Sequence, residues 1–232
     1  MWYWLFKYVF MGPLLTLLGR PKVEGLEYVP DSGAVILASN HLAVADSFYL
    51  CLVVRRRITY LAKSEYFSGT GLKGWFQRWF FTAAGQVPID RADADSAQGA
   101  LETASRLLDE GKLLGMYPEG TRSPDGRLYK GKTGMSRVAL RTGVKVIPVA
   151  MIGTDGVNPP GSKMWRFGRV TVRFGKPMDF SRFEGLEGNR FIERAVVDEV
   201  MYELMRLSGQ EYVDLYAADI KEGKQPSAEL VA

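Results

Sequence analysis

The stretch "AVILASNHLAVAD", residues 34–46, is a continuous aliphatic run that ends in a polar turn. Such runs are typical of β-strands that are covered on both faces. The turn contains His41, the only histidine in the 232 residues. In open α/β sheets, ligands bind outside the carboxyl ends of the strands. The stretch therefore predicts a buried strand over residues 34–39 with a functional group just beyond it.

The rest of the chain alternates similar runs with helical patterns. In residues 93–111, Leu101, Ala104 and Leu108 recur at helical spacing, and Gly111 is a stop signal. Residues 134–143 and 189–207 are two further helical patterns. Strands alternating with helices predict an α/β fold, a mostly parallel sheet covered by helices on both faces. The further predicted strands are residues 58–63, 86–90, 112–117, 145–153 and 170–175.

The composition fits one large soluble domain or, less readily, two small ones, since 47% of the residues are apolar and 24% are charged. A net charge of +4 favours anionic partners, namely phosphates, nucleic acid or acidic lipid, without choosing among them. One cysteine, Cys51, excludes an internal disulfide framework. One histidine and one cysteine also argue against a metal site built from these residues, and we expect no metal.

Residues 1–20, MWYWLFKYVFMGPLLTLLGR, are apolar up to Gly19 except for Lys7 and Thr16. A spanning helix needs roughly 20 apolar residues, and Gly12-Pro13 interrupts this one. Trp and Tyr prefer the headgroup level of a bilayer. We therefore expect a membrane-interface anchor over residues 1–20, with a true span and packing on the protein's own core as alternatives.

Residues 71–85, GLKGWFQRWFFTAAG, combine aromatic side chains with two cations. An aromatic-rich, basic amphipathic helix is a common interfacial anchor. The alternative is a core-facing helix whose cations extend to solvent. The domain proper is expected over residues 21–210, with a C-terminal helix and tail over 211–232.

His41 and Asp46 are candidates for proton transfer. A histidine is a suitable general base at neutral pH because its unperturbed pKa is roughly 6.5. A carboxylate can fix its tautomer and stabilise the imidazolium. A separation of five residues works if His41 lies in the turn and Asp46 in the first turn of the following helix. The alternative is a structural histidine with Asp46 as a helix N-cap.

Residues 116–123, MYPEGTRS, follow the predicted strand 112–117 and should reach the same sheet edge as His41. A glycine permits close backbone approach, and a guanidinium can bind phosphate through two parallel hydrogen bonds. Further cations follow nearby, so a phosphorylated ligand is indicated, with a solvated basic face as the alternative. The residues are Glu119, Gly120, Thr121 and Arg122, with Arg91, Lys130 and Lys132.

Residues 126–133, GRLYKGKT, match the phosphate-binding pattern G-x-x-x-x-G-K-[ST]. That loop binds nucleotides when it joins a strand directly to a helix. Polar residues precede it here, and the nearest predicted strand ends at about Tyr117. The nucleotide-binding interpretation is therefore disfavoured.

Four motifs, in this order and at these intervals, resemble the glycerophosphate and lysophosphatidate acyltransferase family. They are NHLAVAD (40–46), VPIDR (87–91), YPEGTR (117–122) and VIPVAM (146–151). The resemblance implies a membrane-associated α/β enzyme that moves an acyl chain from a coenzyme A or carrier-protein thioester to a glycerol hydroxyl. No further cofactor is implied.

Carried over residue by residue, the resemblance implies that His41 and Asp46 form the catalytic pair. The substrate site would comprise Arg91, Glu119, Gly120, Thr121, Arg122 and Lys132. Three departures stand out. Tyr117 replaces a usual phenylalanine, Pro88 replaces a bulky apolar residue, and Gly131 replaces an aromatic residue, which leaves the choice between Lys130 and Lys132 open.

The expected activity is acylation of 1-acylglycerol 3-phosphate (lysophosphatidic acid) to phosphatidic acid at the cytoplasmic face of the cell membrane, by a peripheral or monotopic protein. The partners would be the lipid acceptor, the acyl thioester and the membrane surface, with no nucleic acid. The alternatives are another acceptor (glycerol 3-phosphate, a lysophospholipid or a glycolipid) or a basic membrane-binding protein without chemistry.

Overall fold

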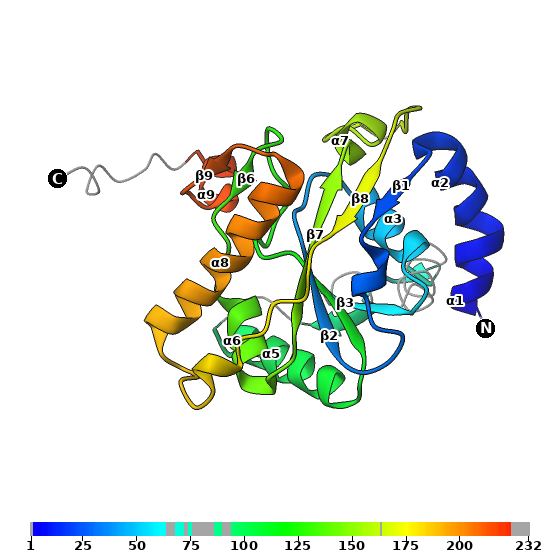
Figure 1. The fold of residues 1–232 in the computed structure, drawn as a ribbon. Coiled ribbons are helices and arrows are strands. Elements are labelled where there is room, and N and C mark those ends of the chain that lie inside the picture. The colour runs from blue at the N-terminus through cyan, green and yellow to red at the C-terminus, as the bar shows by residue number, and fades with distance from the viewer. Residues whose placement is uncertain are drawn as a thin grey trace.

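The computed structural model describes residues 2–63, 68–71, 74–75, 86–89, 94–162 and 164–223. Within these ranges, seven strands form one sheet in the order β1-β8-β7-β2-β5-β3-β4 (Figure 1). Every neighbouring pair is parallel except β7 and β8. The predicted mostly parallel α/β fold is confirmed. The strands are β1 (Lys22–Glu24), β2 (Val35–Ser39), β3 (Ile58–Lys63), β4 (Gln86–Ile89), β5 (Leu113–Met116), β7 (Val146–Ile152) and β8 (Thr171–Phe174).

Helices lie on both faces of this sheet (Figure 1). The principal ones in the described ranges are α3 (Ala45–Val53), α5 (Ala94–Asp109), α6 (Gly134–Thr142), α7 (Thr154–Val157) and α8 (Arg190–Ser208). Short 3-10 turns are η2 (Leu26–Tyr28) and η4 (Ser181–Phe183). A second, two-stranded sheet joins β6 (Leu128–Tyr129) to β9 (Tyr212–Val213), and α9 (Ala217–Lys221) follows.

Strand β2 lies inside the sheet, and its side chains contribute to the hydrophobic core on both faces. Val35 and Leu37 join the core cluster that α3 completes, whereas Ile36 and Ala38 join the cluster formed with α5, α6 and α8. All four side chains are at most 2% exposed. Burying one Leu or Ile contributes about 1.5–3 kcal/mol, so this strand stabilises both layers at once. A charged residue in place of Leu37 would therefore break the fold.

The N-terminal helical segment consists of α1 (Trp2–Leu5), the π-helix η1 (Phe6–Met11) and α2 (Gly12–Gly19). Its inner side packs on the protein's own core. Leu15 is 1% exposed, and its carbonyl accepts a hydrogen bond from the Tyr49 hydroxyl. Gly19 lies against that hydroxyl, because an added Cβ would come within 2.1 Å of it. Lys7 is buried and donates to the carbonyl of Val54, so it does not face outward.

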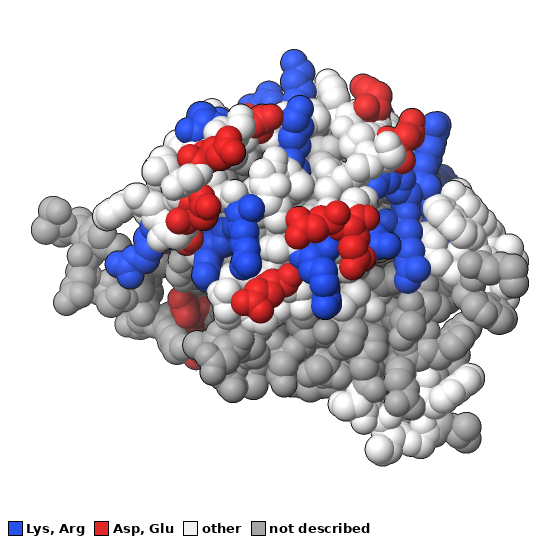
Figure 2. Space-filling model, turned by 90° about the horizontal axis from the view of Figure 1, so that it is seen from below, with Lys and Arg blue, Asp and Glu red and all other residues white. Residues whose placement is uncertain are grey.

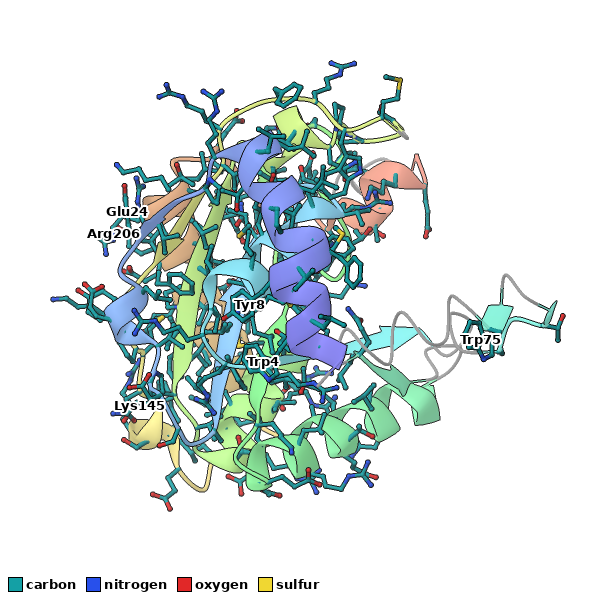
Figure 3. All side chains as sticks on the ribbon, turned by 90° about the vertical axis from the view of Figure 1, so that its right-hand side faces the viewer. Trp4, Tyr8, Glu24, Trp75, Lys145 and Arg206 are labelled. Atoms are coloured by element: carbon teal, nitrogen blue, oxygen red, sulfur yellow. The ribbon has the colours of Figure 1, made fainter. Side chains whose placement is uncertain are left out.

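The outer side of the same segment is apolar and exposed, and Trp4 and Tyr8 show its course in Figure 3. Phe10 is 62% and Leu17 is 59% exposed. Among the residues that the structure describes, no helix is both long and apolar enough to cross a bilayer. The exposed outer side chains are Trp4, Leu5, Tyr8, Val9, Phe10, Leu14 and Leu17.

Of the aromatic stretch 71–85, only residues 71, 74 and 75 are described, and Trp75 is 57% exposed. The remaining residues of that expected helix lie outside the described ranges, as do Arg91 and residues 224–232.

Helix α8 begins at a conventional cap and ends in a sharp turn. The Asn189 side chain accepts hydrogen bonds from the backbone N–H groups of Phe191 and Ile192. Gly209 follows the helix with φ of +72°, a left-handed conformation that glycine adopts without a steric cost. The chain therefore reverses and directs residues 210–221 back over the carboxyl edge of the sheet.

The opposite, amino edge of the sheet shows acidic and basic side chains interleaved where Figure 2 displays described residues. Lys145, just before β7, lies 3.9 Å from Asp179, and Lys112, just before β5, lies 3.9 Å from Glu110. These cations have carboxylate partners, so this edge does not carry a concentrated positive field.

Candidate active site

Two loops meet at the carboxyl edge because β2 and β5 are parallel neighbours. Leu37 pairs with Gly115 and Ala38 with Met116, so the turn after β2 and the loop after β5 emerge side by side. Gly115 is required there, because an added Cβ would lie 2.3 Å from the Tyr60 ring. The predicted convergence of His41 with the PEGTR loop is therefore present.

Asn40 fixes the end of β2 to β7. Its side chain accepts from the backbone N–H of Met151 at 2.7 Å and donates to the Met151 carbonyl at 2.9 Å. It also donates to the Gln210 side chain at 2.7 Å. Asn40 is fully buried, and these bonds satisfy its amide. The sequence assigned it no role, although a polar residue at the end of an apolar strand was the available signal.

Asp46 holds the catalytic histidine candidate from the first turn of α3. One carboxylate oxygen, Oδ2, accepts from His41 Nδ1 at 2.8 Å and from the backbone N–H groups of Leu42 and Ala43 at 2.7 and 2.8 Å. Asp46 is fully buried, whereas the His41 side chain is 18% exposed. With Nδ1 donating to the carboxylate, Nε2 of the neutral ring is the free acceptor.

This geometry matches the arrangement that the five-residue spacing required. The residue that precedes α3 is Val44, and Asp46 bonds backward to the turn rather than forward into the helix. The simple N-cap alternative therefore does not describe Asp46. Its bonds fix the turn and the imidazole together.

Tyr117 covers one face of the histidine ring. The two ring centroids are 3.8 Å apart and the planes are 14° apart. The Tyr117 hydroxyl lies 2.6 Å from Ser47 Oγ, and the Tyr60 ring stacks behind at 5.9 Å. Burial raises the pKa of Tyr117 well above its usual value, so the phenol stays neutral.

Glu119 is a buried connector rather than an open ligand. Its Oε1 accepts from the backbone N–H of His41 and its Oε2 from that of Tyr129, both at 3.0 Å. Burial raises the pKa of Glu119 to about 7, and the two amide donors oppose that shift. The carboxylate thus ties the histidine turn to residues 126–130.

Two exposed cations lie in or beside residues 120–122, which follow Glu119. Gly120 has φ of +73°, and an added Cβ would lie 3.3 Å from the Lys132 side chain. Lys132 is exposed and lies against this loop, whereas Lys130 pairs with Asp214 at 2.8 Å. Arg122 is also exposed. The structure therefore places Lys132, rather than Lys130, against Gly120.

The unusual Gly131 has a packing explanation. An added Cβ would lie 2.8 Å from Val197 and 3.0 Å from Met201, both on α8. A larger residue at this close approach would force the Val197 or Met201 side chain to shift.

Sequence reasoning missed Lys221, whose ammonium group donates to Thr121 Oγ1 at 3.0 Å and to the Arg122 carbonyl. No motif near residue 221 indicated this contact. Among the described residues, no group of three or more His, Cys, Asp or Glu is arranged to hold a metal ion.

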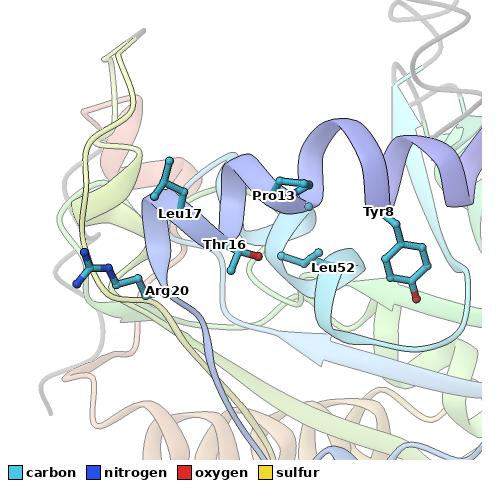
Figure 4. Close-up of a pocket in the computed structure, with 7 residues that line it drawn as sticks. Tyr8, Pro13, Thr16, Leu17, Arg20 and Leu52 are labelled. Carbon is cyan, nitrogen blue, oxygen red and sulfur yellow. The ribbon is translucent and has the colours of Figure 1, made fainter.

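An open groove lies between the N-terminal segment and α3, and none of the predicted site residues that the structure describes lines it (Figure 4). Its volume is about 560 Å³. Leu52, in its wall, lies six residues along α3 from Asp46, roughly 9 Å at 1.5 Å per residue. The lining residues are Tyr8, Gly12, Pro13, Thr16, Leu17, Arg20 and Leu52.

The doubly covered sheet thus carries a histidine–aspartate pair and exposed cations at its carboxyl edge. The chain belongs to the acyltransferase family. The family model described as "Acyltransferase" matches residues 20–152. The resemblance noted from the four motifs is confirmed.

Two curated plant relatives show which members of the family the chain is similar to. The chain is 34% identical over 167 residues to the chloroplastic 1-acyl-sn-glycerol-3-phosphate acyltransferase LPAT1 of Arabidopsis thaliana, covering 71% of this chain and 45% of that protein. It is 32% identical to the corresponding BAT2 protein of Brassica napus, covering 68% of this chain and 45% of that protein. The chain thus spans about half the length of these curated relatives.

A solved structure matches over most of both chains. The crystal structure of the 1-acyl-sn-glycerophosphate acyltransferase PlsC from Thermotoga maritima gives a TM-score of 0.68 at 25% sequence identity. The match covers 90% of this chain and 81% of that chain.

Proposed function

We propose that the protein transfers an acyl chain from a coenzyme A or carrier-protein thioester to the free hydroxyl of 1-acylglycerol 3-phosphate, which produces phosphatidic acid. The observation that carries the proposal is the His41–Asp46 pair at 2.8 Å, placed beside the cation-bearing loop 119–122. The names of the relatives and of PlsC support this acceptor.

The reaction would be a direct transfer. His41 Nε2 removes the proton of the acceptor hydroxyl as the oxygen attacks the thioester carbonyl. The tetrahedral intermediate collapses, the C–S bond breaks, and the imidazolium returns the proton to the leaving sulfur. Asp46 stabilises the imidazolium and holds the ring, as the aspartate does in serine hydrolases. One histidine suffices, since the same proton is taken up and released.

The acceptor's phosphate would lie against the loop after β5. Arg122 and Lys132 are exposed there, and Arg91, outside the described residues, is a further candidate. A guanidinium can bind phosphate through two parallel hydrogen bonds, and an ammonium acts as a point charge. Glu119 and Gly120 would shape the loop, because one binds backbone amides and the other permits Lys132 to approach.

The exposed outer side of residues 1–20 would rest on the membrane that holds the acceptor, at its cytoplasmic face. Seven large apolar side chains face outward there, which is costly in water and favourable at a lipid interface. The groove beside α3 opens on the same segment, and an acyl chain could enter it from that side.

Two alternatives predict different outcomes. A different acceptor, such as glycerol 3-phosphate, a lysophospholipid or a glycolipid, would keep the chemistry and change the preferred substrate. A membrane-binding protein without chemistry would consume no thioester. The buried carboxylate on His41 favours an enzyme, since membrane binding does not need that pair.

The test is thioester consumption by purified protein, with an acceptor panel analysed by mass spectrometry. The expected result is phosphatidic acid from 1-acylglycerol 3-phosphate, with His41→Ala as the inactive control. A wild-type protein that consumes no thioester with any acceptor would overturn the proposal.

A further inference from the structure

The segment that follows α8 returns to the site. Residues 209–221, here called the C-terminal strap, run beside residues 126–130, where β6 pairs with β9. The Gln210 side chain accepts from Asn40 at 2.7 Å and donates to the Gly126 carbonyl at 2.6 Å. The strap is therefore hydrogen-bonded both to the turn that contains His41 and to the loop that contains Gly126.

Lys221, at the end of the strap, reaches the PEGTR loop itself. Its ammonium group donates to Thr121 Oγ1 at 3.0 Å and to the carbonyl of Arg122. Since an ammonium group has only donors, the Thr121 oxygen must accept. The Thr121 hydroxyl hydrogen has no acceptor among the described residues. This O–H group and the third ammonium N–H are both available to an anion.

The positive charge at this loop is not balanced. In the part of the chain that the structure describes, Arg122, Lys132 and Lys221 form no ion pair with a carboxylate. Their neighbours differ, because Arg127 pairs with Asp125 at 2.7 Å and Lys130 pairs with Asp214 at 2.8 Å. The unpaired cations of this region therefore lie at residues 120–122 and beside them, where the backbone N–H of Ser123 donates to the carbonyl of His41.

The Glu119 carboxylate attracts Lys221 and partly opposes the lowering of its pKa, but the two side chains form no ion pair. Both oxygens of Glu119 accept from backbone amides, and burial keeps the pKa of Glu119 raised to about 7. Partial burial and then the charge of Arg122 lower the pKa of Lys221. The positive charges of Arg122 and Lys221 repel each other, and an anion bound between them would offset this repulsion.

We propose that Lys221 is a further acceptor-binding residue, which holds the phosphate together with Thr121 and Arg122. The proposal rests on the proposed function, because it places the phosphate of 1-acylglycerol 3-phosphate at residues 120–122. The family match ends at residue 152, so the strap supplies this cation from outside the matched region.

The test is calorimetric titration of the full chain in detergent micelles with 1-acylglycerol 3-phosphate and, separately, with unphosphorylated 1-acylglycerol. The variants are Lys221→Met, Lys221→Arg and the control Lys176→Met, at an exposed lysine just after β8. Lys221→Met should weaken binding of the phosphorylated lipid about tenfold, as expected for one charged hydrogen bond. Lys221→Arg should retain most of the affinity, and the unphosphorylated lipid should bind all variants equally.

Turnover separates this proposal from the proposed function. Lys221→Met should raise the KM for the phosphorylated acceptor and leave kcat within about twofold of wild type, since uniform binding is removed. Equal weakening of both lipids, or unchanged binding of the phosphorylated one, would overturn the role of Lys221. Phosphate-selective binding by a wild type without turnover would instead reject only the acyl transfer.

Discussion

The phenol ring of Tyr117 lies flat on the imidazole of His41, with centroids 3.8 Å apart, and its hydroxyl bonds to Ser47 Oγ at 2.6 Å. Ser47 directly follows Asp46, which holds Nδ1 of the same imidazole. The imidazole is thus held on its face by Tyr117, just after β5, and on its edge by Asp46, from α3. An imidazolium that forms during proton transfer would also gain from the aromatic face beneath it.

Removing the stacked ring should impair catalysis more than binding. In Tyr117→Leu, the imidazole of His41 loses the aromatic ring stacked on it but keeps its hydrogen bond to Asp46. We expect kcat to fall roughly tenfold, the effect of a loosened catalytic group, with the KM for the thioester nearly unchanged. Steady-state kinetics with varied thioester would measure this, and a raised KM at constant kcat would contradict it.

The hydroxyl pair makes a separate prediction for stability. Tyr117→Phe keeps the stack and should cost about 0.5–1.5 kcal/mol. Ser47→Ala should cost a similar amount, because it removes the same bond while Tyr60 remains beside the Tyr117 hydroxyl. Urea unfolding of both single variants and the double variant tests this. If the double variant were as unstable as the sum of the two single changes, the bond would not be the cause.

Loss of either member of the His41–Asp46 pair should nearly abolish turnover if the proposed mechanism holds. His41→Ala should lower acyl transfer by roughly 10²–10⁴-fold, the usual effect of a positioned base. Asp46→Asn should also be severe, since it removes the charge that stabilises the imidazolium. The two losses should not add, because both residues act on one step. A folded His41→Ala protein with more than a tenth of wild-type activity would disprove the general-base role.

Glu119 should make stability depend on pH. Its folded pKa is raised to about 7 from a usual value near 4.5. Between these values the folded state binds more protons than the unfolded state, so the free energy of unfolding falls as pH rises through this interval. Glu119→Gln should remove this component. Unfolding measured at pH 5 and pH 7.5 tests it, with the exposed Glu187→Gln as control, and parallel profiles of wild type and Glu119→Gln would contradict it.

The features that could be predicted from the sequence are those encoded in short, continuous stretches of residues. The aliphatic runs identified the inner strands, and the five-residue spacing identified His41 with Asp46, because each signal lies within one short stretch. Strand β1 was missed, since its three residues, KVE, form no apolar run at the sheet edge. Contacts such as Lys221 with Thr121 span a hundred residues and depend on the turn at Gly209. No local pattern encodes them.

Cys51 should not carry an acyl group. Burial raises the pKa of its thiol to about 11, so almost no thiolate exists at neutral pH. Cys51→Ala should retain activity. Intact-mass analysis after incubation with the thioester alone should find no acyl adduct, and a stable adduct on Cys51 would refute direct transfer.

The outer side of the N-terminal segment should govern membrane binding. Val9 and Phe10 are 58% and 62% exposed and do not line the groove, so replacing both by Glu removes insertion without disturbing the packed inner side. Each lost contact should weaken vesicle binding roughly tenfold, since burying such a side chain is worth about 1.5–3 kcal/mol. Attraction to anionic lipid is screened by salt, whereas insertion is not. High salt should therefore weaken binding of the wild type and nearly abolish that of the double variant.

A matched control sits on the other layer of the molecule. Phe191, on α8, is 87% exposed, and α8 covers the opposite face of the sheet (Figure 1). Phe191→Glu should bind vesicles as the wild type does if the N-terminal side is the docking surface. All variants should acylate a short-chain, water-soluble acceptor at the wild-type rate, because His41 and Asp46 are untouched. Equal co-sedimentation of the double variant and the wild type at high salt would show that this apolar side does not insert, and the anchor would have to be sought elsewhere.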